Sequence, residues 1–130
     1  MSKRTPVLLF GLFIVAPILA LTAAGCDPAT GSCAGSWTRA DGSKGQICSE
    51  LGAGSTAGAD DLKALCTAGG GTYSASDCAT ADVLGHCDNA PLTGTVTAVL
   101  VDYYYVADGV PEAEVKQHCE GNGGTYTAGL

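Results

Sequence analysis

The seven cysteines of this 130-residue chain constrain its fold more than any other feature of the sequence. If the first, Cys26, has a separate role, an even number remains, as a set of disulfides requires. The chain has no Cys-x-x-Cys motif, which would be typical of a zinc knuckle or a thioredoxin-like redox pair. In an exported domain of this size, three disulfides are therefore expected. The six remaining cysteines are Cys33, Cys48, Cys66, Cys78, Cys87 and Cys119.

The N-terminus predicts export. Lys3 and Arg4 precede an uncharged apolar run over residues 7–21, and small residues follow, which together are the three parts of a secretory signal peptide. Gly11 and Pro17 interrupt the helical pattern of the run, which is shorter than the roughly 20 residues that span a bilayer. We therefore predict a cleaved signal peptide over residues 1–25, with an uncleaved anchor helix as the alternative.

The cleavage site Ala23-Ala24-Gly25-Cys26 resembles the lipobox of bacterial lipoproteins, with Ala23 where that family favours leucine. The resemblance implies cleavage after Gly25 and lipidation of Cys26, whose sulfur would carry a diacylglycerol and whose new amine can receive an acyl chain such as palmitate. Each buried CH₂ contributes about 0.8 kcal/mol, so two or three chains give durable anchoring in a cell membrane. Secretion without lipid, after cleavage near Ala24, is the alternative.

The exported part is one small acidic domain. Residues 26–30 form a lipidated tether, and residues 31–130 suffice for a single domain. Once Lys3 and Arg4 are removed, 4 basic and 13 acidic residues remain, a formal charge of about −9 that disfavours nucleic acid as a partner. With 19 Gly, 2 Phe and 1 Trp, the aromatic core is thin, and disulfides must supply part of the stability.

The domain contains an internal repeat. Residues 61–75 align without gaps with residues 114–128, and both segments contain Cys-x-x-x-Gly-Gly-Thr-Tyr. Upstream, Gly31-Ser-Cys33 matches Gly85-His-Cys87. The repeat units cover about residues 31–80 and 84–130, and we predict an α+β fold in which each unit is strand, strand, helix, strand.

The strands of this fold are predicted from turn signals and β-branched or aromatic content. Asp41-Gly42 between two short apolar runs indicates a β-hairpin in the first unit. In the second unit, residues 89–94 indicate a turn that leads into the longest strand. The strands expected before the helices are residues 36–39, 46–51, 84–88 and 95–106.

Each unit is expected to continue with a short helix and a last strand that begins at Thr-Tyr. Asp60 can cap the first helix, and Pro111 fits the first position of the second. Glycines at 69–71 and 123–124 should end the helices as left-handed caps. Residues four apart share a helical face, which should point inward. These inward residues are Leu62 and Cys66 in the first helix and Val115 and Cys119 in the second.

The repeat narrows the 15 ways of pairing six cysteines. Pairing within units joins Cys33 to Cys66 and Cys87 to Cys119, which leaves Cys48 with Cys78. A second scheme, Cys33 with Cys87 and Cys66 with Cys119, also respects the repeat.

The lipobox, the repeated Cys-x-x-x-Gly-Gly-Thr-Tyr and the run Tyr103-Tyr104-Tyr105 together resemble the small cysteine-rich predicted lipoproteins that are abundant in myxobacteria. That family has no assigned activity, so the resemblance implies no catalytic residue and no cofactor. It implies a bacterial envelope lipoprotein.

Tyr103, Tyr104 and Tyr105 form the candidate contact patch, because tyrosine combines an apolar ring with a polar tip. On a strand, Tyr103 and Tyr105 face one side and Tyr104 the other. His86 and His118 lack the spacing of metal ligands and are interpreted as surface residues, so no metal site is predicted.

The expected function is that of a membrane-anchored structural or interaction module without catalysis. Its partners would be the bilayer, through Cys26, and an envelope protein or glycan. The alternative is a secreted or lipid-anchored small enzyme or metal-binding protein.

Overall fold

The structure, a computed structural model, describes residues 30–130. The predicted signal peptide, the lipidation site Cys26 and most of the tether lie outside the described residues. The described part has a mixed α+β fold, as predicted, and consists mostly of sheet with two helices and three disulfides. Neither helix within it is long and apolar enough to cross a membrane.

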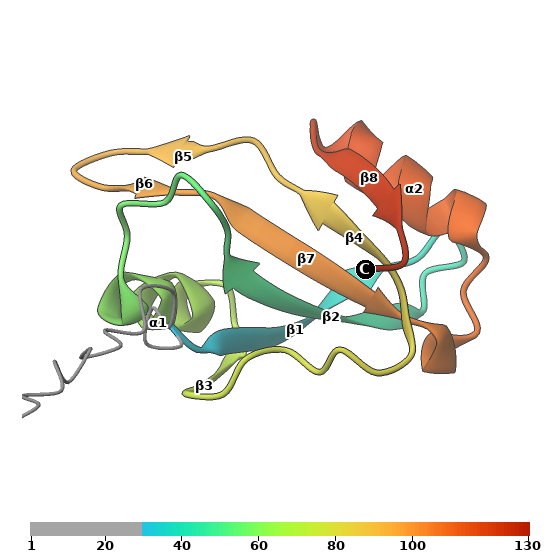
Figure 1. The fold of residues 1–130 in the computed structure, drawn as a ribbon. Coiled ribbons are helices and arrows are strands. Elements are labelled where there is room, and N and C mark those ends of the chain that lie inside the picture. Colours follow the sequence, from blue (N-terminus) through green and yellow to red (C-terminus); the bar gives the residue numbers. More distant parts are fainter. Residues whose placement is uncertain (1–29) are drawn as a thin grey trace, which may run out of the picture.

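An antiparallel six-stranded sheet with the strand order β3-β1-β2-β7-β4-β8 forms the centre of the fold. Its strands are β1 (Ser32–Thr38), β2 (Lys44–Leu51), β3 (Thr72–Ser74), β4 (Val83–Asp88), β7 (Leu100–Tyr105) and β8 (Thr125–Ala128). A separate two-stranded ribbon pairs β5 (Leu92–Thr93) with β6 (Thr97–Ala98). The helices α1 (Ala59–Ala68) and α2 (Glu112–Gly121) lie at opposite ends of the sheet, and a short 3-10 turn, η1 (Val106–Asp108), precedes α2 (Figure 1).

Both helices cover the same face of the sheet. Cys33 and Trp37 stand four residues apart on β1, so their side chains point to the same side. Cys33 is bonded to Cys66 of α1, while the Trp37 ring lies 4.5 Å from the ring of His118 on α2. One face of the sheet therefore carries a helix at each end.

The main core lies under α2. Tyr104 and Val115 are almost fully buried there, and the Trp37 and Tyr104 rings meet edge to face at 5.8 Å. Such aromatic pairs contribute about 0.5–1.5 kcal/mol beyond the area they bury. The predicted inward residues of both helices, Leu62, Cys66, Val115 and Cys119, are all 3% exposed or less. The buried cluster consists of Trp37, Cys87, Tyr104, Val110, Val115 and Cys119.

Three disulfides join the helices and one loop to the sheet. Cys33–Cys66 links β1 to α1, Cys87–Cys119 links β4 to α2, and Cys48–Cys78 links β2 to the segment after β3. These are the pairs of the scheme that pairs cysteines within units. In the chain-entropy model, closing loops of 30 to 33 residues stabilises the fold by about 3–4 kcal/mol each.

The repeated Gly-Gly pair is explained by the backbone and the disulfides. The first glycine, Gly70 or Gly123, has a left-handed φ of +76° or +83° where the chain leaves the helix. A Cβ on Gly71 would lie only 2.6 Å from a sulfur of the adjacent disulfide, and a Cβ on Gly124 would meet the equivalent sulfur at the other helix. The second glycine is therefore required by close packing.

The longest predicted strand, residues 95–106, is wrong in extent. It is divided at Val99, whose backbone bonds to a loop: Gly52 N donates to Val99 O at 2.8 Å, and Val99 N donates to Ser55 Oγ at 2.9 Å. The chain before Val99 turns back to pair with β5 instead, so the expected turn at residues 89–94 contains a short strand.

The predicted helix starts are also wrong by one or two residues. Gly58, and not Asp60, is the N-cap residue of α1. The Gly58 N–H donates to Asp61 Oδ2 at 2.8 Å, so the Asp61 carboxylate provides the hydrogen bond at this end of the helix. Pro111 has an extended backbone and stands just before α2 as its N-cap residue.

Candidate functional site

The candidate site is an apolar groove between α1 and the β5–β6 ribbon. On α1, the groove is lined by one stripe of side chains at helical spacing, Asp61, Ala64, Leu65 and Ala68. This stripe lies beside the face that buries Leu62 and Cys66. Helix α1 therefore presents apolar side chains both to the sheet and to the groove.

The ribbon forms the opposite wall because a loop holds it in front of α1. Thr56 N and Ala57 N both donate to Thr97 O, at 2.8 and 3.0 Å, and Thr97 N donates to Thr56 Oγ1 at 2.8 Å. These bonds hold β6 beside the loop that leads into α1. The ribbon side chains that face α1 are thereby positioned by backbone contacts.

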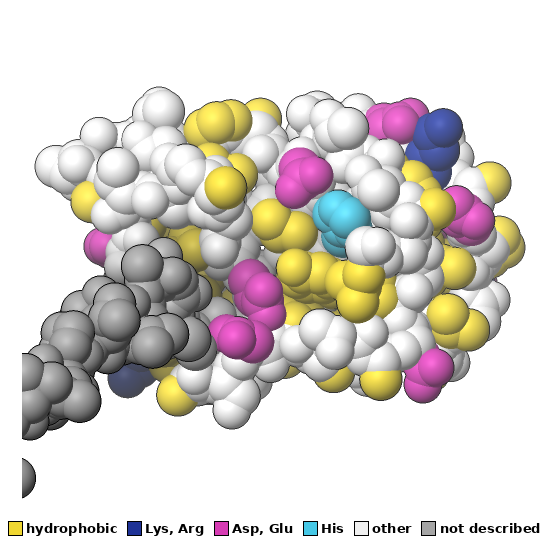
Figure 2. All heavy atoms as spheres, in the orientation of Figure 1, with side chains coloured by type: hydrophobic (Ala, Val, Ile, Leu, Met, Phe, Trp, Pro, Cys, Tyr) yellow, Lys and Arg dark blue, Asp and Glu magenta, His cyan; other side chains and the backbone are white. Residues whose placement is uncertain are grey.

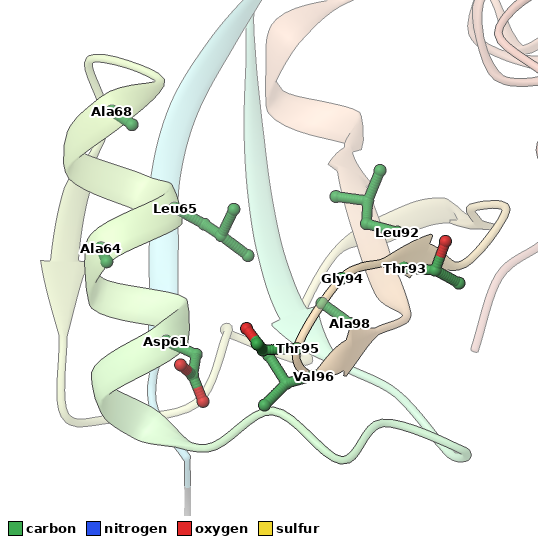
Figure 3. A pocket seen from close by; sticks show the side chains of 10 residues that line it. All are labelled: Asp61, Ala64, Leu65, Ala68, Leu92, Thr93, Gly94, Thr95, Val96 and Ala98. Carbon is green, nitrogen blue, oxygen red and sulfur yellow. The ribbon is translucent and has the colours of Figure 1, made fainter.

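The groove has a volume of about 450 Å³. Leu65 projects from α1 toward the ribbon, with Leu92 on the facing wall, while Asp61 and Val96 lie at the same end (Figure 3). Leu65, Leu92 and Val96 are 40%, 52% and 36% exposed, and they make up three of the five large exposed hydrophobic residues in residues 30–130. Concave, mostly apolar surfaces are common places for binding sites, so this groove is the candidate site.

Charged groups are sparse in the groove and mostly acidic elsewhere. Asp61 is the only titratable side chain among the residues described as lining it. Acidic side chains are spread over the face shown in Figure 2, on which few basic side chains are visible. A partner that carries positive charge would therefore be attracted to this domain.

The predicted contact patch at Tyr103–Tyr105 requires correction. Tyr104 is 2% exposed and belongs to the core, where burial raises its pKa far above the usual value, so it cannot contact a partner. Tyr103 lies opposite Cys48 in the register, on the sheet face away from the helices. Burial also raises the pKa of Tyr103, because this ring is only partly exposed.

A loop of the domain covers part of that second face. The Cys48–Cys78 disulfide fixes the loop to β2, and Cys78 N donates to the carboxylate of Glu50. The hydroxyl of Tyr105 donates to Ala79 O at 3.1 Å. Tyr103 and Tyr105 therefore pack partly against the protein itself.

The two histidines have separate structural surroundings. The His118 ring packs on Trp37, whereas His86 Nδ1 lies 3.0 Å from Gly129 O and His86 Nε2 lies 3.8 Å from Asp88. Both histidines are therefore partly buried and are not the surface residues that the sequence predicts. Over residues 30–130, no group of three or more His, Cys, Asp or Glu side chains could hold a metal ion.

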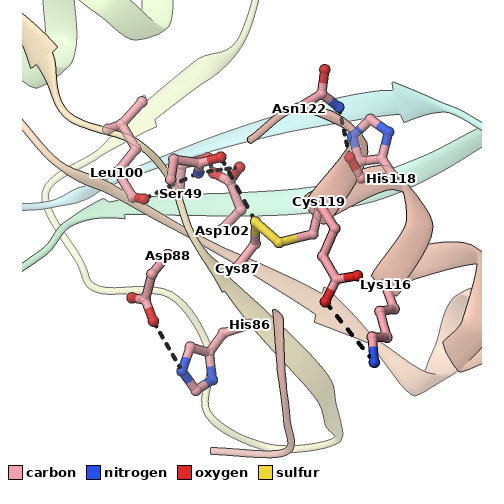
Figure 4. Close-up of a disulfide and its surroundings, with 12 residues drawn as sticks. Ser49, His86, Cys87, Asp88, Leu100, Asp102, Lys116, His118, Cys119 and Asn122 are labelled. Atoms are coloured by element: carbon pink, nitrogen blue, oxygen red, sulfur yellow. Dashed lines mark hydrogen bonds and ion pairs between the residues drawn. A yellow bond between two sulfur atoms is a disulfide. The ribbon is translucent and has the colours of Figure 1, made fainter. Parts of the chain in front are cut away.

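A polar cluster beside the Cys87–Cys119 disulfide is internally satisfied. Asp102 accepts a hydrogen bond from Ser49 Oγ, beside the disulfide (Figure 4). It also accepts one from Asn89 Nδ2 at 2.7 Å, and Asn89 Nδ2 donates to Leu100 O at 3.1 Å. These bonds link β2, β7 and the end of β4. The cluster is explained as a structural link between the two central strands.

Comparisons with family models, with curated proteins and with solved structures found no match.

Proposed function

We propose that this protein is a bacterial envelope lipoprotein, anchored through lipidated Cys26, that acts as an interaction module. Its binding surface is the groove between α1 and the β5–β6 ribbon, and its partner is an apolar segment of an envelope protein. The observation that carries this proposal is the gathering of Leu65, Leu92 and Val96 in one open groove.

Export and anchoring are supported by the N-terminal sequence and by the cysteines. The apolar run and the Gly25-Cys26 sequence resemble a lipoprotein signal. Disulfides persist in oxidising compartments, and all six cysteines after Cys26 are paired in this fold. The tether would then display the groove close to the membrane surface.

The proposal includes two related units as the basis of the architecture. The strand order supports it, because β3-β1-β2 is followed across the sheet by β7-β4-β8, the corresponding strands in reverse order. The disulfides support it too, since Cys33 and Cys87 lie on corresponding strands and Cys66 and Cys119 on corresponding helices. A half-turn about an axis between β2 and β7 would exchange the units.

The groove can bind by apolar burial. Covering a leucine side chain fully contributes about 1.5–3 kcal/mol relative to leaving it in water. Leu65 and Leu92 are 40% and 52% exposed, so a partner that covers them would gain a corresponding part of this free energy. General acid–base chemistry is not proposed, because Asp61 has no second titratable group beside it among the described lining residues.

In-cell photo-crosslinking tests the proposal. A photo-reactive residue at Leu92, inside the groove, should give one discrete adduct with an envelope protein. The same residue at Val106, which is 56% exposed and lies outside the groove, is the matched control and should not give that adduct. Equal adducts from both positions, or none from Leu92, would contradict a binding role for the groove.

A further inference from the structure

The two helices present corresponding residues to their surroundings. The repeat alignment, at an offset of 53 residues, matches Asp61 with Glu114 and Leu65 with His118 in sequence. Both pairs line a space beside their helix: Asp61 and Leu65 line the groove at α1, and Glu114 and His118 line a smaller cleft at α2. What covers α2 therefore indicates what chemistry α1 can accept.

At α2, the end of β1 and the turn that follows it contact the corresponding residues. The Trp37 ring lies 4.5 Å from the ring of His118. Ala40 N donates to Glu114 Oε1 at 2.9 Å, and Arg39 Nη2 donates to Glu114 Oε2 at 3.4 Å. An aromatic ring and a cation two residues later therefore contact α2. A cleft of about 190 Å³ remains beside Glu114, and His118 also borders a second cavity of about 330 Å³.

At α1, the corresponding connection is residues 89–99 between β4 and β7, which contains no aromatic residue and no Lys or Arg. It leaves a groove of about 450 Å³, in which Leu65 remains 40% exposed. Asp61 uses Oδ2 to accept the Gly58 N–H, and its Oδ1 accepts no hydrogen bond from residues 30–130. Helix α1 therefore presents an exposed leucine and a carboxylate. No aromatic ring or cation of residues 89–99 covers them as Trp37 and Arg39 cover the corresponding residues of α2.

We infer that the groove recognises a turn or strand segment of a partner protein that carries a large aromatic side chain and, two residues later, an arginine or lysine. The ring packs on Leu65, Leu92 and Val96, and the cation pairs with Asp61. The arrangement repeats the contacts of Trp37 and Arg39 on α2, and the acidic domain favours a cationic segment. This inference rests on the proposed function and specifies its partner.

A cyclised, fluorescently labelled peptide with the sequence of residues 36–45 is the probe, because it contains Trp37, Arg39 and their turn. It is titrated against the full mature protein in detergent, and binding is followed by fluorescence anisotropy. Saturable binding is expected, and Leu92→Ser should weaken it about tenfold, as loss of a central apolar contact does. Leu130→Ser, which removes another exposed leucine outside the groove, is the control and should leave the affinity unchanged.

The cation contact is tested separately. Asp61→Asn keeps an oxygen for the Gly58 N–H and removes the charge, so it should weaken binding about three- to tenfold. Asp60→Asn removes the same charge from the same helical turn without touching the groove and should have little effect. With a peptide that has alanine in place of Arg39, the difference between the two variants should disappear.

Several outcomes would overturn the inference. Absence of saturable binding, or equal weakening by Leu92→Ser and Leu130→Ser, would show that the groove does not accept this chemistry. If the Leu92 adduct still formed in cells, the proposed function would stand and only the partner chemistry would be wrong. Dimerisation of the free protein that Leu92→Ser abolishes would overturn it in favour of a second copy as the occupant.

Discussion

At the scale of single residues, the second glycine of the repeated motif is the clearest link between sequence and packing. Gly124 packs against the Cys87–Cys119 disulfide. A Cβ added at this position would lie 3.2 Å from the backbone oxygen of Asp88. Neither neighbour is a flexible side chain that could move aside. The glycine occurs at the same position of both copies of the motif, and close packing against the disulfide explains why.

Gly124→Ala should therefore destabilise the protein by about 1–3 kcal/mol, as overpacking of a dense core does. Gly121→Ala is the matched control, because Gly121 is helical and an added Cβ there meets no atom within 4 Å. This control should be neutral or stabilising by up to about 1 kcal/mol, since alanine favours helix. Urea denaturation without reductant measures both, and equal free energies of unfolding would contradict the close-packing explanation.

The groove residues could not be identified from the sequence for a related reason. Leu65 stands at helical spacing from Leu62 and Ala68, so its pattern is that of an ordinary core stripe. Leu92 and Val96 lie in a segment predicted as a turn and the start of a strand. Only the long-range contacts of the ribbon show that these residues lie opposite one another.

At the scale of elements, local signals predicted the hairpin, both helices and the two final strands. Turn glycines, helical spacing and β-branched residues act within a few residues of one another, so they can be recognised in the sequence. The division of the long strand at Val99 depends on bonds to Gly52 and Ser55, far away in the chain. Such tertiary bonds override local strand propensity.

Two of the disulfides should contribute unequally to the free energy of unfolding. Cys87→Ala with Cys119→Ala should cost more stability than Cys48→Ala with Cys78→Ala. The two bonds close loops of 32 and 30 residues, so the chain-entropy loss is nearly equal, about 3–4 kcal/mol in each case. The Cys87–Cys119 bond also fills the core, with both residues 1% exposed or less, and its removal adds a cavity cost of about 1–2 kcal/mol.

Urea denaturation of the two double variants without reductant provides the comparison. Because the loop lengths match, the Cys48/Cys78 variant serves as the control for chain entropy. Equal losses would show that core packing around Cys87 contributes nothing beyond the crosslink.

At the scale of the whole molecule, covalent bonds compensate for a small aromatic core. Both Phe residues of the chain, Phe10 and Phe13, lie outside the described residues, and Trp37 joins the first half of the chain to α2 of the second half. Three crosslinks that each contribute about 3–4 kcal/mol are comparable with the 5–15 kcal/mol stability of an ordinary domain. The stability of the fold therefore depends on keeping these disulfides oxidised, and the proposed export and anchoring depend on residues 1–26.

The intact mass of the non-reduced protein, extracted from membranes and treated with a thiol-alkylating reagent, tests export, anchoring and pairing together. We predict a chain that begins at Cys26, is heavier by about two or three acyl chains, and takes up no reagent. Cys26→Ser should abolish the added lipid mass and release or stall the protein. A lipid-free wild-type chain, or alkylation at two or more cysteines, would contradict a lipid-anchored domain with three disulfides.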